Sequence, residues 1–173
     1  MTTPSQHFVL MGVSGTGKTS VAQALHQKYG WPYAEGDEFH PPENIAKMQA
    51  GTPLTDADRA PWLASIATWM TEQSVKGHNT LVTCSSLKRA YRDILRAAQG
   101  DVLFIHLTGE QNLLAQRMNA RQGHFMPASL LTSQFATLEG LATDEAGTVI
   151  DVSGSQEEVA TTALSFIERS LTA

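Results

Sequence analysis

The glycine-rich stretch GVSGTGKT, residues 12–19, constrains the fold of this chain more than any other feature. It follows an apolar run, FVLMG at 8–12, and leads directly into KTSVAQALHQKYG, which is typical of a helix. Every fixed position of the pattern G-x-x-x-x-G-K-[ST] is matched, and the pattern requires this strand–loop–helix context. A glycine-rich turn without a ligand would not need the lysine and the threonine. The sequence therefore predicts a phosphate-binding loop, or P-loop, after a buried strand.

The chemistry of such a loop assigns a task to each residue type. Glycines let the backbone fold around a phosphate, so that successive N–H groups and the helix N-terminus point at it. Lys18 is expected to reach the β and γ oxygens, and the Thr19 hydroxyl is expected to bind Mg²⁺. ATP with Mg²⁺ is therefore the predicted ligand. The predicted nucleotide contacts are Gly12, Val13, Ser14, Gly15, Thr16, Gly17, Lys18 and Thr19.

Short apolar runs alternate with amphipathic stretches along the whole chain. The runs lie at 8–12, 32–36, 80–85, 102–107 and 148–152. They are rich in branched or aromatic residues, as buried parallel strands are. This alternation predicts a single α/β domain over residues 1–173, a three-layer sandwich whose central five-stranded parallel sheet carries helices on both faces.

Composition excludes several classes of function. With 173 residues and 42% hydrophobic content, the chain can form one real core. Its net charge of -5 argues against a general nucleic-acid or anionic-membrane surface. Cys84 is the only cysteine, so no internal disulfide is possible and a cytoplasmic location is expected. The N-terminal residues resemble neither a signal peptide nor a membrane span.

Polar residues that follow the strands form a candidate acceptor site, because ligands bind beyond the carboxyl ends of parallel strands. The second strand is followed by Glu35, Asp37 and His40, and the third by Ser85, Ser86 and Lys88. Arg59 comes from the long insertion between these strands, and Arg92 lies one helical turn after Lys88. Cations in such a site would hold an anionic group, while a carboxylate would accept a hydroxyl proton.

Each of these residues also has a simpler reading. Asp37 would serve equally as a solvated loop acid, and a lone loop histidine such as His40 is usually structural. Arg59 would form an ordinary salt bridge to Asp56 or Asp58. Lys88 and Arg92, at i and i+4, are predicted to face the pocket together, and the alternative is a solvated basic face.

The third strand, TLVTCSS, lacks the terminal aspartate that binds the metal in many P-loop proteins. Glu35 and Asp37 are the available substitutes. Glu35 is predicted to act through water, because Mg²⁺ keeps several of its waters.

Four stretches in order, LMGVSGTGKT, GDEFHPPENIAKMQAGTPLTDADRAPWL, CSSLKRAYRDILR and ARQGHF, resemble the P-loop gluconokinase family, relatives of the shikimate and nucleoside monophosphate kinases. The resemblance covers about residues 8–140. It implies a nucleoside-monophosphate-kinase-like P-loop NTPase with an acceptor-binding insertion at about 37–75 and a lid at about 117–127. It also implies transfer of the ATP γ-phosphoryl group to the 6-hydroxyl of D-gluconate by a cytoplasmic homodimer.

With this resemblance, the candidate residues take roles. Asp37 would orient the acceptor hydroxyl and take its proton, since phosphoryl transfer depends mainly on positioning and charge stabilisation. The predicted substrate contacts are Asp37, His40, Arg59, Lys88, Arg92 and His124. Arg117 and Arg121 lie four residues apart in the predicted lid. As the lid closes, they would neutralise the charge that develops on the phosphates during transfer. Another acceptor, shikimate or a nucleoside monophosphate, and a non-enzymatic ATP-binding switch are the alternatives.

Overall fold

Strands and helices alternate along the described part of the chain, residues 3–120 and 128–173 of a computed structural model. The strands are β1 (Gln6–Met11), β2 (Tyr33–Glu35), β3 (Thr80–Thr83), β4 (Asp101–Thr108) and β5 (Gly147–Asp151). The helices are α1 (Lys18–Tyr29), the short 3-10 helix η1 (Gly36–Phe39), α2 (Pro42–Gln49), α3 (Asp56–Val75), α4 (Arg89–Arg96), α5 (Gln111–Asn119), α6 (Ala128–Thr137) and α7 (Gln156–Thr172).

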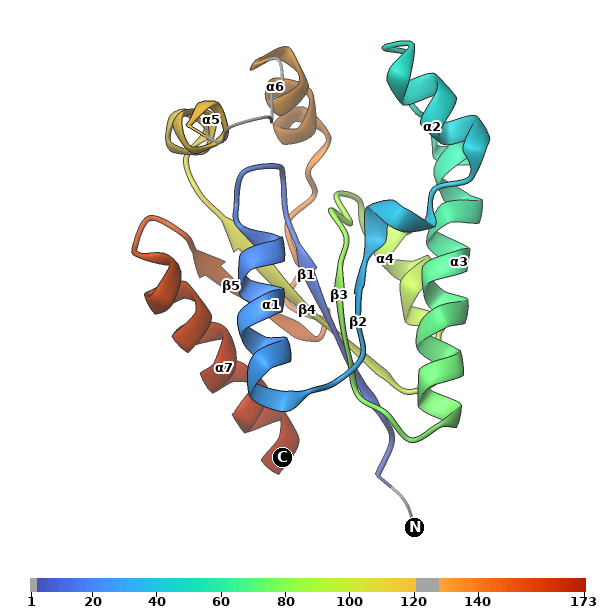
Figure 1. The fold of residues 1–173 in the computed structure, drawn as a ribbon, viewed down its shortest axis with the longest axis vertical. Coiled ribbons are helices and arrows are strands. Elements are labelled where there is room, and N and C mark those ends of the chain that lie inside the picture. Colours follow the sequence, from blue (N-terminus) through green and yellow to red (C-terminus); the bar gives the residue numbers. More distant parts are fainter. Residues whose placement is uncertain (1–2, 121–127) are drawn as a thin grey trace.

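The five strands form one sheet in the order β2-β3-β1-β4-β5, and every neighbouring pair is parallel. Helices cover both faces of this sheet (Figure 1). The predicted three-layer α/β sandwich with a five-stranded parallel sheet is therefore confirmed. All five carboxyl ends finish at the same edge, and this edge carries the P-loop.

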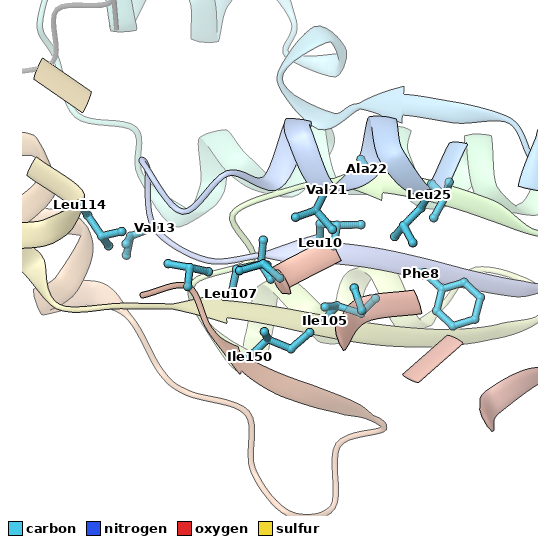
Figure 2. Packing of buried hydrophobic residues seen from close by; sticks show 14 of the residues in the cluster. Phe8, Leu10, Val13, Val21, Ala22, Leu25, Ile105, Leu107, Leu114 and Ile150 are labelled. Atoms are coloured by element: carbon cyan, nitrogen blue, oxygen red, sulfur yellow. The ribbon is translucent and has the colours of Figure 1, made fainter. Parts of the chain in front are cut away.

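Side chains that alternate along β1 divide the core into two layers, as the period of a strand requires. Phe8 and Leu10 pack toward α1 and α7, where Val21, Leu25 and Ala163 are also buried. Figure 2 shows this layer, with the α1 side chains directed at the sheet. Both helices are thus held against one face of β1 and β4.

The opposite layer takes the intervening residues of β1, Val9 and Met11. They pack against α3 and α4, through side chains that include Trp62, Ile66 and Leu95. This layer holds the middle of α3, from Trp62 to Met70, and the first residues of the helix extend from it toward the carboxyl edge of the sheet (Figure 1).

Local signals predict where several helices begin. At α3 the Thr55 hydroxyl accepts from the Asp58 N–H, and the Asp58 carboxylate accepts from the Thr55 N–H in return. Pro42 occupies the first turn of α2, where its missing N–H costs nothing. The expected helix through QRMNARQGHF is shorter, because α5 ends at Asn119. Within the described ranges no helix combines the length and the apolar character needed to cross a membrane.

Candidate active site

The P-loop connects β1 to α1 and packs closely on the end of β4. Gly12 has a φ of 139° and Gly17 a φ of 86°, both in a region that favours glycine. A Cβ at Gly12 would also collide with the backbone carbonyl oxygen of Leu107. Backbone conformation and close packing therefore both require glycine at position 12.

The start of α1 presents donors and a positive charge to this loop. Gly17, the N-cap, has no side chain to accept from the N–H groups of the first turn. A phosphate oxygen can take that place, and the helix dipole favours its negative charge. Lys18 Nζ donates to the carbonyl oxygens of Gly12 and Val13, each at 3.0 Å. Its ammonium thus lies over the loop, where a phosphate would be cradled.

A pocket of about 320 Å³ opens beside the P-loop. Gly15 and Gly17 line it from the loop, Arg117 from α5, Gly154 from the segment between β5 and α7, and Gln156 from the start of α7. Arg117 Nη2 donates to the Gly154 carbonyl oxygen at 3.3 Å, which joins the walls that these two residues form. Three segments that are distant in sequence therefore enclose one pocket beside the loop.

Glu35, the last residue of β2, has a carboxylate held by hydroxyl groups. Tyr33 and Thr83 donate to it, and the Thr19 side chain bonds it as well. Burial alone would raise the pKa of Glu35, but these hydrogen bonds and the charge of Lys18 hold that pKa below its ordinary value. An ionised carboxylate therefore lies beside the Thr19 hydroxyl, and oxygen ligands of this kind suit Mg²⁺.

Thr83 compensates for the absence of a metal-binding aspartate at the end of the third strand. Its hydroxyl donates to Glu35 and accepts from the Gly36 N–H at 3.3 Å, so β3 supports a carboxylate that β2 supplies. Among the described residues, no three or more His, Cys, Asp or Glu side chains are grouped to hold a metal ion. A cation beside Glu35 would therefore complete its coordination with hydroxyl oxygen, phosphate or water.

Asp37 and His40 lie on and directly after η1, at the carboxyl edge of the sheet. The Asp37 side chain is exposed. The His40 ring stacks on Trp62 with centroids 4.2 Å apart and bonds the Asn44 amide at 3.2 Å. Burial lowers the pKa of His40, the charge of Asp37 raises it, and the charge of Arg59 lowers it further. Asp37 and Arg59 are thus each close enough to His40 for their charges to act on its ring.

Arg59 and Lys88 approach the same aromatic ring from two different elements. The Arg59 guanidinium carbon and the Lys88 ammonium each lie 5.6 Å from the centroid of Tyr91. Arg59 Nη1 donates to the Leu54 carbonyl oxygen at 2.7 Å and to the Tyr91 hydroxyl at 3.3 Å. The alternative of a salt bridge to Asp56 or Asp58 is wrong, because Asp56 pairs with Lys88 at 3.2 Å and Asp58 with Lys47 at 2.8 Å.

Arg92 does not face the pocket with Lys88, so this prediction is wrong. Its side chain is fully buried, and its Nε and Nη2 bond the Glu145 carboxylate at 2.7 and 3.0 Å. Nη1 donates to the carbonyl oxygens of Ser86 and Glu139, and Nη2 also donates to Gly140. The guanidinium donors are therefore occupied by protein groups. Helical spacing relates positions on one helix, but Lys88 precedes α4 as its N-cap and leaves the helical path.

The Arg92 contacts hold the turn that follows β3. Ser86 is buried and has a φ of 50°, a left-handed conformation unusual for a residue with a Cβ. The carbonyl oxygen of Ser85 accepts from the Gly12 N–H at 3.1 Å, so the turn is also tied to the P-loop. The remaining two candidates, Arg121 and His124, lie outside the described residues.

Several residues of the site were not predicted. Tyr91 and Trp62 are absent from the predicted set, yet the Tyr91 hydroxyl donates to Asp56 and the Trp62 indole N–H donates to the Gly36 carbonyl oxygen. Gln134 of α6 accepts from the Ser14 N–H of the P-loop at 2.8 Å, across a large sequence separation. No local sequence signal marks a glutamine for such a contact.

Comparisons with known proteins agree with this geometry. The shikimate kinase family matches residues 14–168. A gluconokinase of Gluconobacter oxydans is 54% identical over 149 residues, which are 86% of this chain and 83% of that protein. The chain belongs to the gluconokinase family.

Solved structures extend this relationship to three dimensions. A gluconokinase from Sinorhizobium meliloti matches with a TM-score of 0.85 and 45% identity, over 98% of this chain and 94% of that one. A sugar kinase from Janibacter sp. HTCC2649 matches with a TM-score of 0.90 and 51% identity, over 95% of both chains. This member of the gluconokinase family therefore has the P-loop kinase fold over almost its full length.

Proposed function

We propose that this chain is an ATP-dependent gluconokinase that transfers the γ-phosphoryl group to the 6-hydroxyl of D-gluconate. The observation that carries the proposal is the meeting of three groups at one sheet edge: the P-loop, the Asp37 carboxylate, and the cations Arg59 and Lys88. An acceptor with a hydroxyl at one end and a carboxylate at the other suits this arrangement. D-gluconate is such a molecule.

The nucleotide is assigned to the P-loop and its neighbouring pocket. The phosphates would lie at the start of α1 beneath the Lys18 ammonium, which neutralises charge on the β and γ oxygens. The base and ribose would occupy the pocket of about 320 Å³, between Arg117 and the Gly154–Gln156 segment. This placement leaves the γ-phosphoryl group on the side of the loop that faces β2 and β3.

The residues around Glu35 fit a magnesium ion. The Thr19 hydroxyl and the Glu35 carboxylate are hard oxygen ligands, and Thr83 and Tyr33 keep that carboxylate ionised and oriented. Thr19 would bind the ion directly and Glu35 would hold one of its waters. A magnesium ion held there would supply positive charge that offsets the negative charge developing on the phosphates during transfer.

Asp37 is assigned to orient the acceptor hydroxyl and to take its proton as the bond to phosphorus forms. His40, stacked on Trp62, would hydrogen bond a hydroxyl of the sugar chain. The Arg59 guanidinium presents a planar donor face suited to a carboxylate, and Lys88 adds a second positive charge. The substrate would thus be held at both ends, which fixes its reacting oxygen in line with the phosphoryl group.

Further roles rest on family resemblance together with chain position. Arg117, which lines the nucleotide pocket, and Arg121 would offset charge on the phosphoryl group during transfer. We assign the chain to a single domain, with an acceptor-binding insertion at about 37–75 and a lid at about 117–127. His124 would contact the substrate from this lid. A cytoplasmic homodimer is proposed on the same basis.

A panel of acceptors tests the proposal. With Mg²⁺ and ATP present, D-gluconate is expected to stimulate ADP release far more than shikimate, nucleoside monophosphates or other sugar acids. The Lys18→Ala variant is the control, because it loses the main phosphate-binding charge and should lose turnover with every acceptor. Gluconate-independent hydrolysis alone, or stimulation by a different acceptor, would contradict the assignment.

The metal assignment makes a separate prediction. Glu35→Gln removes the carboxylate charge beside Thr19 but keeps the shape of the side chain. The variant is expected to need about tenfold more Mg²⁺ for half-maximal activity, because loss of an outer-shell ligand typically weakens metal binding by 10- to 100-fold. Magnesium titrations of initial rate measure this. Glu43→Gln on α2 is the control, and an unchanged requirement in Glu35→Gln would refute the role.

A further inference from the structure

An internal carboxylate already occupies part of the cationic acceptor site. Asp56, the first residue of α3, lies with its two carboxylate oxygens 3.2 and 3.3 Å from Lys88 Nζ. The Tyr91 hydroxyl donates to the same carboxylate at 2.5 Å. Lys88, one of the two cations assigned to the substrate carboxylate, therefore has a negative partner before any substrate arrives.

The Tyr91 hydroxyl extends this contact to the second cation. It accepts from Arg59 Nη1 at 3.3 Å while donating to Asp56, so a chain of bonds runs from Arg59 through Tyr91 and Asp56 to Lys88. Both cations lie 5.6 Å from the Tyr91 ring centroid. Two positive charges, one negative charge and one neutral hydroxyl are thus gathered at one place.

The fold of this region does not depend on Asp56. The N-terminus of α3 is capped by Thr55 and Asp58, and Asp58 is also the partner of Lys47. The Asp56 side chain is 64% exposed, so the surrounding core does not require it. Hydrogen bonds from Tyr91 and Lys88 hold the pKa of Asp56 below its ordinary value, so the group is ionised at neutral pH. Neither helix capping nor core packing therefore explains why a negative charge lies beside Lys88.

We propose that Asp56 sets the charge of the acceptor's anion site, so that the site accepts a monoanionic carboxylate and disfavours a dianionic phosphate ester. The inference rests on the proposed function, because it takes Arg59 and Lys88 as the groups that receive the substrate carboxylate. Two cations with one internal carboxylate leave one net positive charge, which a single carboxylate balances. A phosphate ester at the same place would bring an excess negative charge next to Asp56.

The charge dependence gives this proposal a quantitative form. Coulomb energy is proportional to the product of the charges, so removal of the Asp56 charge helps a dianion by twice the energy it helps a monoanion. If the affinity for a carboxylate rises about threefold, as a screened contact of this kind allows, the affinity for a phosphate in the same place rises about ninefold. The ratio of the two affinities therefore changes about threefold.

The test compares Asp56→Asn with Asp93→Asn. Asp93 is a matched control, because its side chain is 61% exposed and it pairs with a cation, Arg96, at 2.9 Å on the same protein. With ATP saturating and at pH 8, where a phosphate ester is dianionic, we measure KM for D-gluconate and the inhibition constant of D-glucitol 1-phosphate against gluconate, because this ester carries its phosphate on the carbon that bears the carboxylate in gluconate. In Asp56→Asn, the KM for D-gluconate should fall about threefold and the inhibition constant of the phosphate ester about ninefold. Asp93→Asn should change neither constant.

Tyr91→Phe is the second variant. It removes the hydroxyl that links Arg59 to Asp56 but keeps the Asp56 charge, so the ratio of the two constants should stay at the wild-type value. Equal changes of both constants in Asp56→Asn, or weaker binding of both ligands, would reduce Asp56 to a structural role and overturn the inference. Absence of gluconate turnover by the wild-type protein would instead overturn the proposed function, and this inference with it.

Discussion

Asp37→Asn is expected to slow phosphoryl transfer about a thousandfold, within the range attributed to a positioned proton acceptor, while ATP binds with nearly unchanged affinity. The amide keeps the size of the side chain but cannot take the proton of the acceptor hydroxyl. ATP affinity is preserved because the P-loop and Lys18 hold the phosphates on the other side of the reacting oxygen. Steady-state kinetics together with equilibrium nucleotide binding measure both quantities.

Glu38→Gln is the matched control for this variant. Glu38 follows Asp37 directly in η1 and is also exposed, so it reports the effect of losing one carboxylate charge nearby. Its rate should stay close to that of the wild type. Survival of Asp37→Asn activity to within about tenfold, or roughly 1.4 kcal/mol of barrier, would refute the role assigned to Asp37.

Arg92→Met is expected to lower the free energy of unfolding by about 3–5 kcal/mol, the usual cost of removing one partner of a buried ion pair. Glu145, whose side chain is 1% exposed, would lose the two donors of the Arg92 guanidinium. The carbonyl oxygens of Ser86, Glu139 and Gly140 would lose donors as well. Denaturant unfolding followed by circular dichroism measures this loss.

Arg89→Met is a suitable control, because Arg89 joins the same helix to the same segment before β5. Its partner, Asp144, lies 2.6 Å away, but both side chains are well exposed and solvent screens the pair. The unfolding midpoint should therefore stay close to that of the wild type. Equal losses of unfolding free energy in the two variants would show that burial does not make the Arg92–Glu145 pair more important for stability than the exposed pair.

The same ion pair predicts a pH dependence of stability. Burial would raise the pKa of Glu145, but hydrogen bonds from Arg92, the Ala142 N–H and Arg96 outweigh it and lower the pKa from 4.5 to about 2. A carboxylate with a depressed pKa contributes its full stability above the unfolded value and loses it as pH falls toward the folded value. Wild-type stability should therefore fall from pH 5 to pH 2 more steeply than that of Arg92→Met.

Local and periodic patterns determined much of this protein from the sequence alone. These patterns determine the P-loop, the strands, the parallel sheet between two layers of helices, and the capping of α3. Each of these features depends on residues that are close in sequence or that repeat with the period of a strand or a helix. Placement of Asp37 and His40 at this edge also followed, because the carboxyl ends of parallel strands meet there. These features need no knowledge of which helix packs against which.

Only the tertiary structure decided the partners of the polar side chains. Lys88 and Arg92 have similar charge and helical spacing, yet Lys88 reaches Asp56 at the site while Arg92 is buried against Glu145. Thr83 takes the place of an expected aspartate by supporting Glu35 from the neighbouring strand. Such pairings join residues that are tens of positions apart, and a one-dimensional pattern carries no information on which of several similar charges will meet. Packing of α3 and α4 on the sheet selects them.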